Sequence, residues 1–162
     1  MTSDINLKIN GVRYAFSVRG DESLLELLRN RVKLTGVKKA CDGIGECGAC
    51  TVLAHGHAIY SCLFPALRAD NTEIVTIEGL SVDNKLHPLQ ESFLKNGAIQ
   101  CGFCTPGMIL SAKALLDDKP EASVQDIHDA LAGNLCRCTG YEKIIEAVLM
   151  AEQTINVVAP KR

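Results

Sequence analysis

The sequence predicts an α+β fold, with a strand-rich first half followed by a helical second half. Up to residue 77, short runs of alternating polar and apolar residues are separated by turn-forming dipeptides, which is typical of strands. From residue 88 onward, the apolar residues recur at helical spacing. The polar segment 79–86 between the two patterns carries turn-forming residues, so we expect two small domains, residues 1–79 and 80–162.

The strands of the first half are predicted around two turns. Asn10-Gly11 is a dipeptide preferred in type I′ hairpins, and a second turn is expected at His55-Gly56. The expected strands are Asp4–Ile9, Val12–Val18, two strands within residues 51–61, and Glu73–Ile77. His55 and His57 form an H-x-H pattern that suits a metal, but their position beside a hairpin glycine favours exposed turn residues.

One helix is expected in the first half and four in the second. Ser23 and Glu26 form a capping box, and the leucines that follow give an apolar face to a helix that runs to about Val32. The helices of the second half are expected at Pro88–Asn96, Pro106–Asp117, Val124–Leu131 and Gly140 to about Gln153. Together they suggest a bundle.

Three of these helices have readable starts. Thr105-Pro106 suits the N-cap and the first helical position, and Ser123 precedes Asp126 by three residues. Residues 139–142 form a second capping box. We expect the last nine residues, 154–162, to lie on a partner or to form a loose tail.

Charge and hydropathy exclude several classes of function. The chain has 17 Lys+Arg against 19 Asp+Glu, a net charge of −2, so no basic surface for nucleic acid or an anionic membrane is expected. The N-terminus lacks the features of a secretory signal, and no apolar run approaches the ~20 residues that span a bilayer. We therefore expect a cytoplasmic protein without membrane insertion.

The eight cysteines are the unusual feature of this composition. In a reducing cytosol they favour metal binding or redox work over disulfides. They divide into two sets, one on each side of the predicted boundary. The first set is Cys41, Cys47, Cys50 and Cys62, and the second is Cys101, Cys104, Cys136 and Cys138. Four thiolates are the number that holds either a [2Fe–2S] cluster or a structural zinc.

The surrounding residues bear on which metal is bound. Three glycines in CDGIGECGAC allow the backbone to turn its N–H groups toward anionic sulfurs, which suits a cluster better than a single zinc. Cys104 and Cys138 each precede a predicted helix start, where unpaired N–H groups favour negative charge. Zinc would be held by the same helix dipoles, so it stays open on spacing alone.

Three segments carry a family resemblance. CDGIGECGACT, QCGFCTPGM and GNLCRCTGY, in this order, resemble the small iron–sulfur subunit of the molybdenum hydroxylases, the family of xanthine dehydrogenase, aldehyde oxidoreductase, carbon monoxide dehydrogenase and 4-hydroxybenzoyl-CoA reductase. The resemblance extends to about Met150, and all eight cysteines match. It implies a β-grasp domain like that of plant-type ferredoxins, then a four-helix domain, each with a [2Fe–2S] cluster.

The resemblance also implies a role. The helical-domain cluster would lie next to a molybdenum cofactor, with Gln100 and Cys138 at positions that contact its pterin, and the other cluster would lie toward a flavin. The implied partners are a large molybdopterin-binding subunit and a medium FAD-binding subunit, assembled as a dimer of heterotrimers. Substrate would be bound and converted outside this chain, which would hold no catalytic residue.

Two alternatives accompany this interpretation. One is a two-cluster ferredoxin that shuttles between enzymes. A single plant-type ferredoxin is disfavoured, because five residues separate Cys41 from Cys47 where that class has four. The other is a zinc-stabilised interaction module without a redox role.

Overall fold

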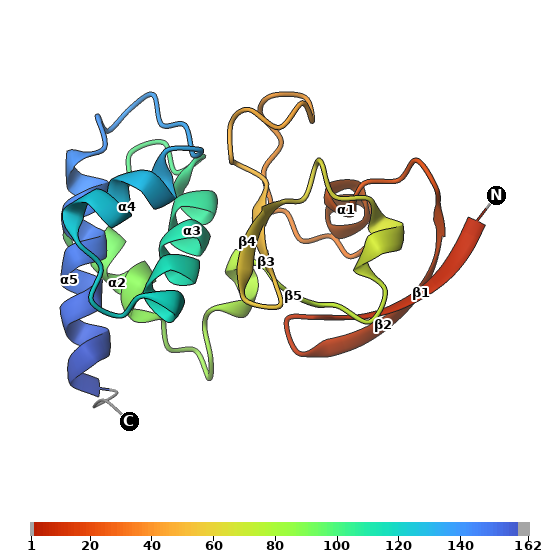
Figure 1. Cartoon of the computed structure of the whole chain (residues 1–162), viewed down its shortest axis with the longest axis horizontal. Coiled ribbons are helices and arrows are strands. Elements are labelled where there is room, and N and C mark those ends of the chain that lie inside the picture. Colours follow the sequence, from red (N-terminus) through yellow and green to blue (C-terminus); the bar gives the residue numbers. More distant parts are fainter. Residues whose placement is uncertain (1, 159–162) are drawn as a thin grey trace.

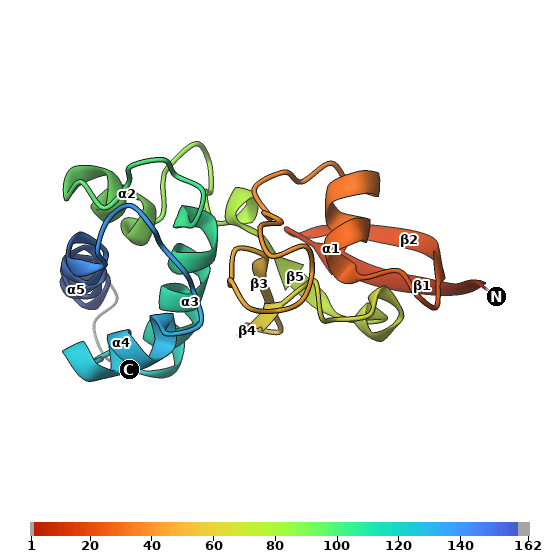
Figure 2. The ribbon, with the colours of Figure 1, turned by 90° about the horizontal axis from the view of Figure 1, so that it is seen from above.

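The α+β class is confirmed by a computed structural model that describes residues 2–158 (Figures 1 and 2). Its strands are β1 (Thr2–Ile9), β2 (Val12–Arg19), β3 (Thr51–Ala54), β4 (His57–Tyr60) and β5 (Glu73–Val75). They form one sheet in the order β2-β1-β5-β3-β4, in which β1 and β5 are parallel and the other neighbours antiparallel. The sheet occupies one half of the molecule and the helical second half lies beside it.

Both predicted hairpin turns form. Asn10 and Gly11 have φ angles of 48° and 84°, and His55 and Gly56 have φ angles of 48° and 84°. Positive φ at both central residues is the requirement of a type I′ turn. The turns set the registers Ile9↔Val12 and Ala54↔His57 across the two hairpins.

The first helix packs its leucines into the core of the sheet half. α1 (Leu24–Glu26) continues as a π-helical turn over Leu27–Arg31. The predicted capping box is present, since the Ser23 hydroxyl accepts a hydrogen bond from Glu26 N (3.2 Å) and the Glu26 carboxylate accepts one from Ser23 N (2.9 Å). The leucines at 24, 25, 27 and 28 are fully buried.

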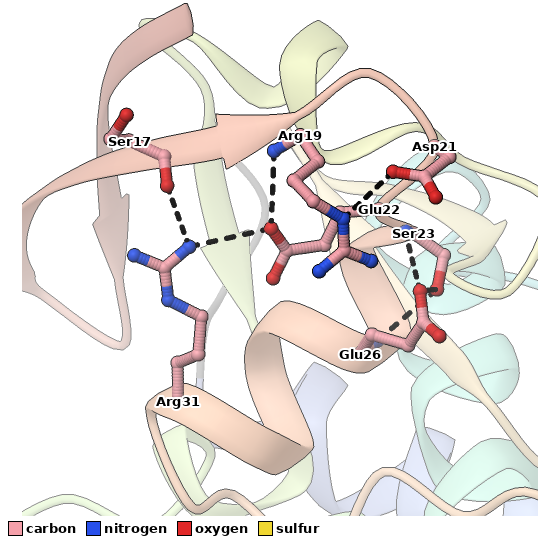
Figure 3. A network of polar contacts seen from close by, with 7 residues as sticks. All are labelled: Ser17, Arg19, Asp21, Glu22, Ser23, Glu26 and Arg31. Atoms are coloured by element: carbon pink, nitrogen blue, oxygen red, sulfur yellow. Dashed lines mark hydrogen bonds and ion pairs between the residues drawn. The ribbon is translucent and has the colours of Figure 1, made fainter. Parts of the chain in front are cut away.

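A polar network fastens this helix to the end of β2 (Figure 3). The Arg31 guanidinium donates to the Ser17 carbonyl (2.9 Å) and to the Glu22 carboxylate (3.3 Å), and it lies over the Phe16 ring. Glu22 in turn accepts a hydrogen bond from Arg19 N (3.4 Å). The Glu22 side chain is almost buried, so its charge is compensated by these donors.

The helices of the second half form a separate core. They are α2 (Pro88–Lys95), α3 (Thr105–Asp118), α4 (Val124–Leu131) and α5 (Glu142–Val158). α3 lies between the other helices and the sheet and packs on β3, whose Val52 points into the sheet core and Leu53 into the helical core. Within the described residues, no helix has both the length and the apolar character that crossing a bilayer requires.

Three boundary predictions were wrong. α5 continues through Val158, because its apolar residues keep helical spacing as far as Ile155 and Asn156 donates to the Pro120 carbonyl (2.9 Å). The expected tail at 154–162 is thus helical to Val158, and residues 159–162 lie outside the described residues. The last strand ends at Val75, after which Ile77–Gly79 forms a 3₁₀ turn. The capping box at Thr139 does not form, because Gly140 and Tyr141 adopt positive φ angles and α5 begins at Glu142.

His87 caps α2. Its side-chain Nδ1 accepts a hydrogen bond from Leu89 N (3.2 Å), and its backbone N–H donates to the Gln90 side-chain oxygen (2.9 Å). Burial lowers the pKa of His87, and the Lys113 ammonium lowers it further against the opposing effect of the Asp117 carboxylate. Only the neutral imidazole can accept the Leu89 bond, so the cap depends on pH.

We expect this cap to make the stability of the fold fall in mild acid. Because the folded pKa is depressed below its unfolded value of about 6.5, the stability that the neutral ring contributes is present above that pH and is lost as the pH falls through the folded pKa. The melting temperature of His87→Ser, whose hydroxyl caps without titrating, should fall less between about pH 7.5 and pH 5.5 than that of the unchanged chain. His87→Ala should lose about 1 kcal/mol at the higher pH. An equal acid effect in all three chains would contradict this.

Candidate metal centres

The first cysteine set surrounds one end of the sheet. Cys41, Cys47 and Cys50 lie in the loop before β3, and Cys62 follows β4. The loop takes a left-handed backbone at its glycines; at Gly45 a Cβ atom would lie 2.4 Å from Leu63. This conformation folds the loop tightly enough to bring its cysteines together.

Backbone N–H groups of this loop point toward Cys41. Burial acts to raise the pKa of the Cys41 thiol, but hydrogen bonds from the backbone of Glu46, the Cys47 side chain and the backbone of Cys47 and Gly43 outweigh burial and lower the pKa to about 6. These donors stabilise a thiolate rather than a thiol. The loop is therefore built to hold negative charge on sulfur.

The sulfurs of the first set associate in two pairs. The Cys47 side chain lowers the pKa of Cys41, and the Cys50 side chain raises that of Cys62. Burial and the neighbouring Cys50 thiol raise the pKa of Cys62 to about 12. A thiolate at Cys62 consequently requires a positive charge beside it, which a bound metal supplies.

The second set repeats this pairing. The Cys138 and Cys101 sulfurs lie 3.6 Å apart, and Cys104 contacts Cys136. Burial and the Cys136 contact raise the pKa of Cys104 to about 12. Cys101 and Cys138 are exposed, whereas Cys104 and Cys136 are partly buried. The set thus has an outer pair and an inner pair.

Paired sulfurs fit two irons better than one zinc. A structural zinc draws all four thiolates onto one ion at about 2.3 Å. In a [2Fe–2S] cluster each iron takes two protein ligands. Both cysteine sets therefore fit [2Fe–2S] clusters, and the N–H groups at Cys41 fit cluster sulfurs as acceptors.

Of the two cysteines expected at helix starts, Cys104 and Cys138, only Cys104 lies at one. Cys104 occupies the N-cap position of α3, so that the helix begins at Thr105 and not at Pro106. Cys138 was expected at a helix start as well, but Thr139, Gly140 and Tyr141 separate it from α5. The macrodipole of α5 therefore does not act directly on Cys138.

The turn that separates Cys138 from α5 places a hydroxyl beside Cys136. The Thr139 hydroxyl lies 3.0 Å from the Cys136 sulfur and accepts a hydrogen bond from Tyr141 N (3.2 Å). The Tyr141 hydroxyl accepts from Cys136 N (2.8 Å) and donates to the Asn134 carbonyl (3.1 Å). Sequence reasoning missed the roles of Thr139, Tyr141 and Asn134, because only the three-dimensional turn brings them together around Cys136.

The remaining candidates lie at the surface. Gln100 is exposed and directly precedes Cys101, a member of the outer sulfur pair. His55 and His57 are exposed at the β3–β4 turn.

Models of two protein families match this chain. The description "2Fe-2S iron-sulfur cluster binding domain" matches residues 7–75, and "[2Fe-2S] binding domain" matches residues 76–149. The nicotinate dehydrogenase small FeS subunit of Eubacterium barkeri is 50% identical over 147 residues, which cover 91% of this chain and 93% of the relative. The xanthine dehydrogenase iron-sulfur-binding subunit of Escherichia coli O157:H7 is 46% identical over 155 residues, which cover 94% and 96%.

Solved structures agree with these relatives. A chain of quinoline 2-oxidoreductase from Pseudomonas putida 86 superposes with a TM-score of 0.90 at 41% identity, covering 96% of this chain and 97% of that one. The aldehyde oxidoreductase from Desulfovibrio desulfuricans ATCC 27774 gives a TM-score of 0.91 at 40% identity, covering 97% of this chain and 18% of that one. The same unit thus occurs as a separate chain and within a much longer one.

We expect Thr139→Val to lower the midpoint potential of one of two clusters. A Cys136 sulfur bound to iron carries no proton, so the Thr139 hydroxyl donates to it, and this hydrogen bond stabilises the extra electron of the reduced state. A difference of about 1 kcal/mol in this bond between oxidation states corresponds to about 40 mV for one electron. Potentiometric titration followed by EPR measures the shift.

Thr139→Ser is the matched control, because it keeps the hydroxyl and should keep the potential. An equal shift in the serine variant, or a shift of both EPR signals in the valine variant, would count against a hydrogen bond specific to Cys136.

Proposed function

The chain belongs to the small iron–sulfur subunits of the molybdenum hydroxylases, and on this premise we propose that it carries electrons between a molybdopterin centre on a larger subunit and a flavin or another external acceptor or donor. The observation that carries the proposal is the arrangement of eight cysteines as two sets, each made of two sulfur pairs. Each set has the ligand number and the pairing of a [2Fe–2S] cluster.

Each half of the chain would hold one cluster. A [2Fe–2S] cluster takes up and releases one electron, so two of them on one chain can pass on singly the two electrons of a substrate oxidation or reduction. We propose a β-grasp ferredoxin domain over residues 1–79 and a four-helix cluster domain over residues 80–162. The matches to residues 7–75 and 76–149 and the separate apolar cores support this division.

The exposure of the sulfur pairs in the second set supports an order in which electrons pass along the chain. Cys101 and Cys138 are exposed beside Gln100, and we propose that Gln100 and Cys138 contact the pterin of the molybdenum cofactor on the partner. Cys104 and Cys136 lie further inside. Electrons would then pass from the outer pair through the inner pair to the set at Cys41, Cys47, Cys50 and Cys62.

The relatives also bear on assembly and substrate. The aldehyde oxidoreductase contains a matching unit within a much longer chain, which supports a partnership with larger subunits. For this chain we propose a large molybdopterin-binding subunit, a medium FAD-binding subunit, a dimer of heterotrimers and a cytoplasmic location. Relatives named for nicotinate, xanthine and quinoline share this small unit, so the partner is expected to select the substrate.

Removal of one ligand tests the assignment of the clusters. In the anaerobically purified complex, two EPR signals are expected after reduction. Cys136→Ala should remove one signal and abolish turnover, since an unreplaced ligand leaves one iron incompletely held while the set at Cys41–Cys62 is untouched. Loss of both signals would contradict two independent sites. A colourless chain with about two zinc ions would refute the cluster assignment and favour the interaction module.

Gln100→Ala tests the contact with the partner. Both EPR signals and both potentials should persist, while reduction of the clusters by the molybdenum centre slows, because the side chain lies beside the outer pair rather than in the ligand set. Gln125→Ala on α4 is the control, as its side chain is exposed and donates a hydrogen bond to Asp129 (2.8 Å) on the same helix. An unchanged rate in Gln100→Ala would show that the contact does not exist, and elution of the chain without any partner would favour the ferredoxin shuttle.

A further inference from the structure

A segment without helix or strand leads from the first helix into the first ligand loop. It covers residues 33–40, which we call the strap, and Cys41 follows it directly. Lys38 N donates to the carbonyl oxygen of Ala49 (3.1 Å), and Ala49 directly precedes Cys50. This bond joins the two ends of the loop that carries three cysteines of the first set, so the position of the strap determines where the loop begins.

Arg29 holds the strap from the side of the first helix. It belongs to the π-helical turn Leu27–Arg31, and its Nη1 donates to the carbonyl oxygens of Thr35 (3.2 Å) and Val37 (2.5 Å). Val37 is buried, so the strap is anchored at an interior point. Because the guanidinium is charged, its hydrogen bonds to these carbonyls are stronger than those of a neutral donor.

Glu78 holds the strap from the other side. Its Oε1 accepts a hydrogen bond from Gly36 N (2.7 Å), and its Oε2 accepts one from the Thr76 hydroxyl (2.6 Å). Thr76 is buried, and its Oγ accepts from Asn10 Nδ2 (2.9 Å) while its N–H donates to Asn10 Oδ1 (2.8 Å). The Glu78 carboxylate thus connects the strap to a fixed point at the end of the sheet.

The backbone of the strap lies directly against the 3₁₀ turn Ile77–Gly79 that carries Glu78. A Cβ atom at Gly36 would lie 2.3 Å from Ile77 Cγ2 and 2.7 Å from Glu78 Oε1, so the contact leaves no room for a side chain there. Residues 35, 36 and 37 are therefore held at three consecutive positions, alternately by Arg29 and by Glu78.

The place of the strap matters for Cys41 because of the donors around its sulfur. Backbone N–H groups of Gly43, Glu46 and Cys47 donate to Cys41. These donors lie further along the loop, whereas Cys41 is attached to the strap, so a displaced strap would carry the sulfur away from them. Hydrogen bonds to a ligand sulfur tune the reduction potential of a cluster, and they favour the reduced state because it carries more negative charge.

We propose that Arg29 and Glu78 are positioning residues for electron transfer at the first cluster: they hold residues 35–37 from two sides and thereby keep Cys41 among its N–H donors. The proposal rests on the proposed function, in which the first cysteine set binds a [2Fe–2S] cluster. Neither side chain belongs to the ligand set. Their role is to keep the reduction potential of the first cluster high, without an effect on the second cluster.

Two pairs of variants test these roles in the complete complex. Arg29→Met removes the donors and keeps an unbranched stem, while Arg29→Lys keeps a charged donor, which suffices because both bonds leave from one nitrogen. Glu78→Ala removes both acceptors, while Glu78→Gln keeps an acceptor for Gly36 N and removes only the charge. Redox titration followed by EPR measures both midpoint potentials, and Cys136→Ala identifies the signal that belongs to the first cluster.

In Arg29→Met and Glu78→Ala, the equilibrium constant for one-electron reduction of the first cluster should fall about tenfold, a shift of about 59 mV to lower potential. Arg29→Lys and Glu78→Gln should keep the potential, and the second cluster should keep its potential in all four variants. An unchanged first potential in a test variant, an equal shift in its conservative partner, or an equal shift of both clusters overturns the role of that residue.

Hydrogen–deuterium exchange of residues 33–40 decides the outcome if a test variant does not retain the first cluster. Faster exchange in this segment, with the second EPR signal kept and the first cluster restored in the conservative variant, supports the role of the residue. Unchanged exchange in the strap, loss of both signals, or loss of the first cluster in the conservative variant as well overturns it.

Failure of this proposal is distinguishable from failure of the proposed function. A complex with two [2Fe–2S] signals whose potentials do not depend on Arg29 or Glu78 retains the function and loses only these positioning roles. Absence of the clusters from the unchanged complex would remove the function itself.

Discussion

Thiolates held at contact distance repel one another, and the structure around them is organised by this constraint. Cys62 and Cys104 are partly buried beside other cysteines, and without positive charge they hold their protons to a pKa of about 12. Cys41 has the opposite environment, with backbone donors that favour its thiolate. The positive charge of a metal must balance thiolates at Cys62 and Cys104, whereas the backbone of the protein stabilises the thiolate at Cys41. The left-handed glycines of the first ligand loop and the Thr139 hydroxyl serve this balance.

Two apolar cores flank the ligand loops and position the elements that carry them. In the sheet half, leucines and the Arg31–Glu22 pair fix the first helix against β2, and the cysteine loop follows this helix along the chain. In the helical half, the core is continuous from α2 to α5 and includes Leu53 from β3. Strand β3 therefore belongs to both packing units, and it starts immediately after Cys50. This placement couples the first cysteine set mechanically to the second half.

Local signals in the sequence predicted local structure well. Both hairpin turns, the capping boxes at Ser23 and Ser123, and the division of the cysteines in the sequence depend on neighbouring residues, whose effects are visible in the chain itself. The parallel pairing of β1 with β5, the direction of Thr139 and the burial of Asn134 depend on residues far apart in the sequence. A buried asparagine before a ligand motif has no distinctive local pattern. The end of α5 was predictable in principle, because Ile155 continues the apolar spacing of the helix.

Three glycines where the two halves meet, Gly48, Gly107 and Gly133, also limit which substitutions the chain can accept. Gly48 belongs to the first half, and Gly107 and Gly133 belong to the second, yet each would clash with the other half if it gained a side chain. Most buried core residues of each half contact their own half, and Leu53 of β3 is a member of the helical core. At the three glycines the two halves cannot vary independently, and a chimera that joins this first half to a helical half from a distant relative would need a matching pair of loop backbones. A side chain at any of these three glycines therefore has to be matched by a change in the facing part of the other half.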